Sequence, residues 1–118
     1  MKKHPYKIKV YYNNNSDLGK KTIAYAKSIS NYVTGINYCS DSFTTTIWRD
    51  LLNRMQLTPK ELLDKANPKY QATLRGHEFD DEGWLNIMMK NPDLIKAPIV
   101  VYGDQVKLCL KPSDILKM

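Results

Sequence analysis

The chain has 118 residues, of which 42% are apolar and 25% charged, and its formal net charge is +6. These values fit one globular domain with a single core, and no apolar run approaches the roughly 18 residues of a membrane span. The first residues hold lysines but no apolar signal-peptide core, and two distant cysteines do not indicate a disulfide framework. We therefore expect a cytoplasmic protein with one domain over residues 1–118 and no membrane contact.

The positive charge is concentrated near the amino terminus. Residues 1–37 hold seven lysines and one acidic residue, Asp17, whereas the rest of the chain holds eleven basic and eleven acidic side chains. Such a field could attract a small anion or an acidic protein surface, or it could be a solubilising lysine face. No arginine precedes Arg49 and no aromatic residues alternate with arginines, which argues against nucleic-acid recognition.

A strand followed by a helix is predicted for the first third of the chain. The strand is indicated by alternating apolar residues at Tyr6, Ile8, Val10 and Tyr12. The helix is indicated by steps of three and four through Leu18, Thr22, Tyr25, Ile29 and Tyr32 or Val33. We expect its cap within residues 15–17, its stop at Gly35, and a short second strand at "INYCS".

The middle of the chain is predicted to be a helical insert at about residues 43–92. Thr44–Thr46 can cap a first helix, and "TPKE" at 58–61 is a capping box with proline at the first helical position. Residues 67–78 show no clear period and are expected to be loop. Asp80 is a candidate N-cap for a last helix reaching Asn91, with Phe79 and Trp84 spaced as a hydrophobic staple.

The last third predicts a hairpin and a closing helix. "PIVVY" and "QVKLCL" read as strands, Gly103-Asp104 supplies a two-residue turn, and Pro112–Lys117 reads as a short helix. The order β-α-β, insert, β-β, α places the first two strands in parallel and adds an antiparallel pair. We therefore predict an α/β fold of thioredoxin-like type, with a four-stranded mixed sheet and helices on its faces.

Three segments of this sequence resemble the arsenate reductase-like branch of the thioredoxin superfamily, which includes Spx regulators and glutaredoxin-like proteins. They are "NSDLGKKT" at 15–22, "LTPKELLDKANPKYQ" at 57–71 and "WLNIMMKNPDLIKAPIVVYGDQVKL" at 84–108, and the similarity extends roughly from Tyr6 to Leu116. The resemblance implies that the Ala97-Pro98 peptide bond is cis. It also implies that residues 13–20 and Ala97-Pro98 together form the place where relatives keep their active site.

Two departures from the family pattern bear on function. By resemblance, Ser16 stands where redox-active relatives carry a cysteine, followed by Asp17, with Lys20 and Lys21 as the family's lysine pair. Ala97 replaces the arginine that binds oxyanions in the reductases. A thiol at a helix start gains nucleophilicity because the helix dipole lowers its pKa, whereas a serine there needs an adjacent base. We therefore expect no catalytic residue at this position.

The remaining candidate nucleophiles and ligands fit no known pattern. His4 and His77 are not spaced for a triad or a metal site, and "HEFDD" at 77–81 is not the zinc-binding HExxH motif. Cys39 and Cys109 lie in predicted strands and are expected to be buried and structural. The turn before the helix also lacks the glycine and the serine or threonine of a P-loop. We expect no metal and no cofactor.

Three functional hypotheses follow. The first is a redox-inactive protein of this family that binds a protein partner or a small anion, with Asn14, Asn15, Ser16, Asp17, Lys20, Ala97 and Pro98 as candidate binding residues. The second is a reductase or transferase that uses Ser16 with Asp17, or Cys39, with Lys20 binding an anion. The third is an Spx-like transcriptional regulator. The sequence leans against an enzyme, and it does not indicate an oligomeric state.

Overall fold

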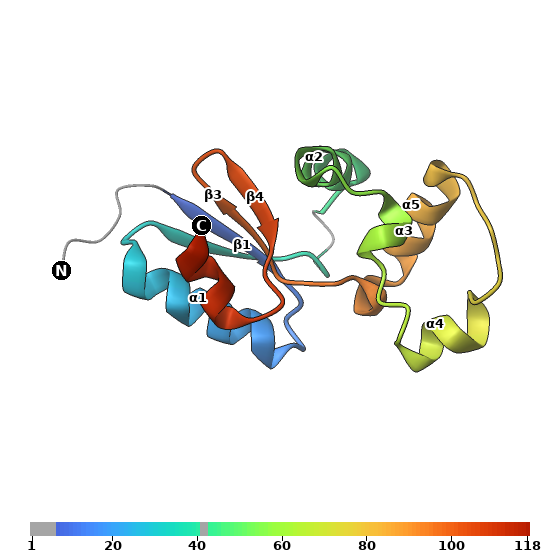
Figure 1. The fold of residues 1–118 in the computed structure, drawn as a ribbon, viewed down its shortest axis with the longest axis horizontal. Coiled ribbons are helices and arrows are strands. Elements are labelled where there is room, and N and C mark those ends of the chain that lie inside the picture. Colours follow the sequence, from blue (N-terminus) through green and yellow to red (C-terminus); the bar gives the residue numbers. More distant parts are fainter. Residues whose placement is uncertain (1–6, 41–42) are drawn as a thin grey trace. The chain divides into compact units, whose positions relative to one another are not determined.

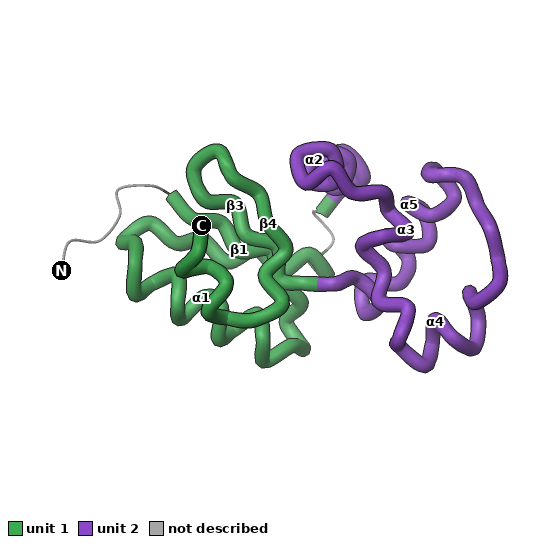
Figure 2. Tube along the Cα trace, viewed as in Figure 1, with its two compact units in different colours: residues 1–43, 97–118 green, residues 44–96 purple. Residues whose placement is uncertain are grey.

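The computed structural model describes residues 7–40 and 43–118, which form two compact units. Unit 1 comprises Met1–Phe43 and Ala97–Met118, and unit 2 comprises Thr44–Lys96 (Figure 2). The predicted helical insert at about residues 43–92 overlaps unit 2. The single domain expected over residues 1–118 stays a prediction. Among the described residues, no helix has the length and apolar character that crossing a membrane requires.

Unit 1 is built on a four-stranded sheet with the order β2-β1-β3-β4. Its strands are β1 (Ile8–Tyr12), β2 (Val33–Asn37), β3 (Ile99–Tyr102) and β4 (Gln105–Leu108). β1 pairs in parallel with β2 and antiparallel with β3, and β3 forms the predicted hairpin with β4. Gly103 adopts φ 59° in the two-residue turn, a conformation that favours glycine.

Helix α1 (Asp17–Ile29) and the 3₁₀ helix η2 (Pro112–Lys117) pack on one face of this sheet (Figure 1). The contact surface is apolar because alternate strand residues point to the same face. The buried cluster consists of Ile8, Val10, Ala26, Val100, Tyr102, Cys109 and Ile115. This packing fixes the start of α1 relative to the end of β1.

The sequence placed the end of α1 and the second strand incorrectly. The helix ends at Ile29, and Gly35 lies inside β2 instead of stopping the helix. A Cβ at Gly35 would lie 3.0 Å from Ile23 Cδ1, so the glycine makes room for α1 over the strand. Tyr25 and Tyr32, expected on the core face, are 41% and 57% exposed. The buried face of α1 instead carries small residues, which allow the helix to lie close to the sheet: Gly19, Thr22 and Ala26.

Unit 2 is helical, and its capping signals are confirmed. It contains α2 (Thr45–Met55), α3 (Pro59–Leu62), α4 (Pro68–Thr73), α5 (Asp81–Lys90) and the 3₁₀ helix η1 (Pro92–Leu94). Thr58 and Glu61 form the capping box of α3, and the Asp80 side chain accepts a hydrogen bond from Gly83 N at 2.8 Å. Phe79 and Trp84 form the staple, with ring centroids 5.0 Å apart.

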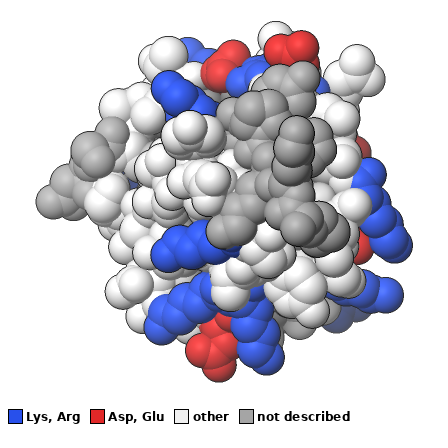
Figure 3. Space-filling model, turned by 90° about the vertical axis from the view of Figure 1, so that its left-hand side faces the viewer, with Lys and Arg blue, Asp and Glu red and all other residues white. Residues whose placement is uncertain are grey.

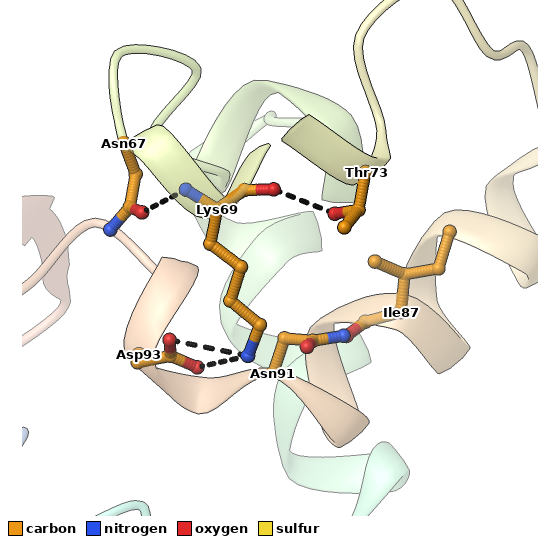
Figure 4. Close-up of polar contacts among 6 residues, drawn as sticks. All are labelled: Asn67, Lys69, Thr73, Ile87, Asn91 and Asp93. Carbon is orange, nitrogen blue, oxygen red and sulfur yellow. Dashed lines mark hydrogen bonds and ion pairs between the residues drawn. The ribbon is translucent and has the colours of Figure 1, made fainter. Parts of the chain in front are cut away.

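Helix α4 lies in the segment that the sequence predicted to be loop. Asn67 is its N-cap, with Oδ1 accepting from Lys69 N at 2.9 Å, and Pro68 occupies the first helical position. Figure 4 shows this cap, together with the ion pair between Lys69 Nζ and Asp93 Oδ1 at 3.2 Å. The helix is too short to show an apolar period. The cap Asn67 and the following Pro68 were therefore the only signals of a helix in the sequence.

Candidate binding site at the start of α1

The candidate residues lie in the turn between β1 and α1, in the first turn of α1 and in the segment before β3. β1 ends at Tyr12 and α1 begins at Asp17, so Asn14, Asn15 and Ser16 occupy the connection. Tyr11 pairs with Ile99, the first residue of β3. The register therefore places Ala97-Pro98 at the same end of the sheet as the turn.

Asparagine side chains hold the backbone of this turn. Asn13 Oδ1 accepts a hydrogen bond from Asn15 N at 2.9 Å, and Asn13 O accepts from Ser16 N at 2.9 Å. Asn37, at the end of β2, accepts from Asn14 N at 3.3 Å and from Cys39 N at 3.2 Å through the same Oδ1. The small polar residues thus fix the turn and tie it to the neighbouring strand.

Ser16 is the N-cap residue of α1, with φ −105° and ψ 123°. Its hydroxyl makes no capping hydrogen bond, which corrects the expectation of a side-chain cap from residues 15–17. Among the described residues, no side chain accepts from the amides of the first turn of α1. Those amides can therefore donate to a ligand.

The charges at this helix start have opposite effects on a bound anion. Asp17 is in the first turn, where its carboxylate interacts favourably with the helix dipole but repels an anion. Lys20 is exposed one turn further and takes part in none of the ion pairs formed by the described residues. Lys20 and the amides would stabilise an anion bound at this site, and Asp17 would destabilise it.

The peptide bond between Ala97 and Pro98 is cis, as the resemblance implied. Pro98 is buried and Ala97 is half-buried. Pro98 O accepts a hydrogen bond from Cys109 N at 2.9 Å, which anchors the proline to the residue that follows β4. Ala97 brings no charge and no side-chain hydrogen-bonding group to this end of the sheet.

The two cysteines lie in different environments, and one of them was predicted incorrectly. Cys109 is fully buried, as expected, and burial together with the nearby Asp114 raises the pKa of its thiol to about 11, against a smaller opposing effect of Lys107. Cys39 is exposed, because β2 ends at Asn37 and Cys39 falls in the turn beyond it. Its amide shares the Asn37 acceptor with Asn14, so this residue borders the candidate turn.

The other sequence candidates do not join this site. His77 is exposed in unit 2 and its ring stacks on Phe79 at 6.1 Å, and His4 lies outside the described residues. In the part of the chain that the structure describes, no three metal-binding side chains gather. A hollow of about 280 Å³ in unit 2 is lined by other residues, among them Arg49, Leu52 and Leu85.

Sequence reasoning missed Asn13 and Asn37, which shape the turn. Asn13 could have been recognised, because an asparagine side chain commonly accepts a hydrogen bond from the backbone amide two residues later and so forms an Asx turn. Asn37 carried none, because its contact with Asn14 depends on the parallel register of β1 and β2. Both are supporting residues of the candidate site.

The β-α-β unit, the antiparallel hairpin, the closing helix and the proline before β3 together define a thioredoxin-like fold. The family follows from the sequence as a whole. The model of the ArsC family matches residues 11–118, so this chain belongs to that family. No curated protein matches the sequence.

Solved structures of similar proteins support the same fold. The chain is similar to a candidate arsenate reductase from Yersinia pestis, with a TM-score of 0.83, 19% identity and coverage of 95% of this chain and 100% of that one. It is similar to an arsenate reductase from Vibrio cholerae, with a TM-score of 0.82, 20% identity and coverage of 97% and 98%. At these identities the similarity establishes the fold and leaves the activity to be argued from the site.

Proposed function

We propose that this protein is a redox-inactive member of the ArsC family that acts by binding, with a protein partner as the favoured ligand and a small anion as the alternative. The observation that carries the proposal is Ser16 at the N-cap of α1, where a redox-active relative is expected to carry its cysteine. The burial and raised pKa of the Cys109 thiol support it, because little thiolate exists there at neutral pH.

A protein partner is favoured over an anion because of the local charges and contacts. Asp17 opposes an anion at the helix start, and Ala97 supplies no cation near the cis proline. Titration with phosphate or sulfate, followed by NMR of the amides of residues 17–19, separates the two ligands. Saturable shifts at millimolar anion would show that the small anion is the ligand.

The redox proposal is tested by turnover. Purified protein is assayed for reduction of arsenate and of a model disulfide, with glutathione and glutaredoxin or with thioredoxin supplied. We expect no rate above that of the coupling system alone. Turnover that Ser16→Ala abolishes would establish instead an enzyme using Ser16 with Asp17 and Lys20.

A cysteine variant tests whether the site geometry persists. Ser16→Cys, made with Cys39→Ala, is expected to have a thiol pKa at least about one unit below that of a model thiol, because the helix start favours the thiolate. The matched control is Ser28→Cys in the same background, in the last turn of α1, where the dipole raises the thiol pKa. Equal pKa values in the two variants would contradict a preserved site.

A second candidate function rests on Cys39. Cys39 is exposed, and its backbone amide shares an acceptor with that of Asn14 next to the turn, so Cys39 is the nucleophile an atypical reductase would use. This activity requires turnover that Cys39→Ala removes and Ser16→Ala leaves intact. An Spx-like regulatory role has the support of the fold alone and requires direct binding of purified RNA polymerase in a pull-down.

We also propose a cytoplasmic location. It is supported by the sequence, because two cysteines far apart in the chain do not make the disulfide framework that is usual in small secreted proteins. Fractionation of cells that express a tagged copy of the chain tests this, and recovery of the protein in a secreted or envelope fraction would contradict it.

A further inference from the structure

The strand β2 is an unprotected edge of the sheet in unit 1. Among the described strands it pairs only with β1, in the order β2-β1-β3-β4, and it is the teal strand beside α1 in Figure 1. Edge strands present unpaired amides and carbonyls, and proteins usually blunt them with lysine, proline or a bulge. Residues 28–40 contain no charged residue and no proline. β2 therefore has none of the usual side-chain protection.

The hydrogen-bond pattern identifies the backbone groups that point outward. Ile8 N donates to Tyr32 O at 2.7 Å, and Tyr38 N donates to Tyr12 O at 3.1 Å. In a parallel ladder alternate residues bond to the neighbouring strand, so even-numbered residues of this stretch face β1. The amides and carbonyls of Val33, Gly35 and Asn37 therefore face away from the sheet.

Two of these three residues have no partner for their outward backbone groups. Asn37 O accepts from Ser40 N at 3.2 Å, which closes that end of the edge. Among the described residues, no hydrogen bond reaches the outward amides and carbonyls of Val33 and Gly35. They form a short template for an added strand.

Lysines of α1 border this edge. Ile23 of α1 packs over Gly35, with its Cδ1 3.0 Å from the position of a Cβ there. Lys20 and Lys27, three residues before and four after Ile23, share its side of the helix. Both are exposed, and neither takes part in the ion pairs that the described residues form. Basic side chains also spread over the surface seen in Figure 3.

We propose that β2 accepts an extended acidic segment of a partner protein as a fifth strand. Main-chain hydrogen bonds to Val33 and Gly35 hold the segment, and its carboxylates on the α1 side contact Lys20 and Lys27. This inference rests on the proposed binding function and deepens it by naming a docking surface and the chemistry of the partner.

A second copy of the chain fits this edge less well. Pairing two β2 strands would bring together two copies of a basic region, since residues 7–40 hold five lysines and one acidic residue. Like charges disfavour such a contact, whereas an acidic segment neutralises the same lysines. The positive charge of this region therefore favours an acidic segment over a second copy of the chain.

The test uses the full chain and three labelled peptides of eight residues. The probe alternates glutamate with valine, one control alternates lysine with valine, and the other is the probe with alternate amides N-methylated. We expect saturable binding of the probe alone. Hydrogen exchange at Val33 and Gly35 should slow by about tenfold or more, because strand addition gives both amides a partner.

Charge variants locate the contact. Lys27→Glu, far from the start of α1, should weaken binding of the probe by about threefold. The double change Lys20→Glu with Lys27→Glu should weaken it by about tenfold. The matched control is Lys65→Glu with Lys90→Glu, exposed lysines of unit 2 that change the net charge equally, and it should change affinity by less than about twofold.

Several outcomes would overturn the inference. They are equal binding of the N-methylated or lysine peptide, unchanged exchange at Val33 and Gly35 with probe bound, and protection of these amides by dimerisation without peptide. The proposed function fails separately, in the turnover assays on the same preparation, which do not depend on β2. A chain that binds the probe yet reduces arsenate would keep the docking edge and lose the redox-inactive assignment.

Discussion

The two units of this protein differ in net charge and in the ion pairs that their charged residues form. Residues 44–96, which form unit 2, hold eight basic and eight acidic side chains, so the whole +6 belongs to the segments of unit 1. Every ion pair formed between described residues lies within unit 2: Arg49–Glu82, Arg54–Asp50, Lys60–Glu78 and Lys69–Asp93. The described lysines of unit 1 take part in none of these pairs and stay available to solvent or to a partner.

This difference separates two uses of charged residues. Exposed pairs contribute little stability, so the pairs in unit 2 mainly keep that surface neutral and self-contained. An excess of charge of one sign does not determine the fold, but it influences which molecules the protein associates with. The proposed binding role therefore concerns unit 1, and we expect each unit to depend on its buried side chains for stability.

The largest expected effect comes from Trp84→Ala in unit 2. Trp84 is 2% exposed, contacts Phe79 edge to face, stacks on Tyr70 at 6.4 Å and has Lys60 Nζ 5.3 Å from its ring centroid. The variant should lose about 3–5 kcal/mol of unfolding free energy in urea titrations followed by circular dichroism. Leu110→Ala, at an exposed position, is the control, and a loss at Trp84 below about 1 kcal/mol would contradict the packing argument.

The next effect concerns pH and the core of unit 1. The folded state raises the pKa of Cys109 from 9.0 to about 11 because it buries the thiol. Folding therefore favours the protonated thiol, so this contribution is complete below pH 9.0 and is lost as the pH rises toward 11. The loss amounts to about 2–3 kcal/mol at most.

Comparison of wild type with Cys109→Ala isolates the contribution of this thiol, because the two proteins differ only at that side chain. We expect the wild type to lose more stability than the variant between pH 9.0 and about 11 in denaturant titrations. Cys39→Ala, at the exposed thiol, should follow the wild-type curve. Parallel curves for wild type and Cys109→Ala would show that the thiol is not desolvated in the native state.

A smaller effect is expected from Gly19→Ala on the buried face of α1. Helix propensity alone would make this change stabilising by up to about 1 kcal/mol. A Cβ at Gly19 would lie 2.7 Å from Tyr12 Cβ, however, so the helix must shift away from β1. We expect a net loss of about 1–3 kcal/mol in thermal and urea unfolding. Lys20→Ala, at the exposed neighbouring position, should be neutral or slightly stabilising, and a stabilising Gly19→Ala would exclude the close approach.

The smallest effect is expected from breaking an ion pair in unit 2. Arg49 and Glu82 approach to 2.6 Å, but both side chains are more than half exposed. Arg49→Met should cost less than about 1 kcal/mol, and the difference from wild type should shrink further in high salt. A cost comparable to that of Trp84→Ala would mean that the charges of unit 2 do hold it together.

Much of the fold could be predicted from local signals. The capping box at Thr58, the N-cap Asp80 and the Gly103-Asp104 turn each act within a few residues, so the sequence carries them directly. The thioredoxin-like fold was predicted from the order of the elements, the cis bond before Pro98 was implied by the resemblance, and both are confirmed. The candidate binding residues remain a prediction.

The features that could not be predicted depend on contacts between distant residues. In the sequence Gly35 is typical of a helix stop, but in the structure it lies in β2 where Ile23 packs over it. Cys39 was predicted to lie in a strand, but β2 ends at Asn37. The tyrosine period through Tyr25 was misleading because small residues bring α1 close to the sheet. In each case tertiary packing overrode the local pattern.

The insertion of unit 2 between β2 and β3 has a consequence for synthesis on the ribosome. β1 is an inner strand, yet its second neighbour, β3, follows residues 44–96 in the chain. At about 5–20 residues per second, several seconds pass between the emergence of β2 and that of β3. During that interval one side of β1 has no strand partner, and residues 44–96 can fold first. The nascent chain can thus fold its later segment before the sheet of its earlier segment is complete.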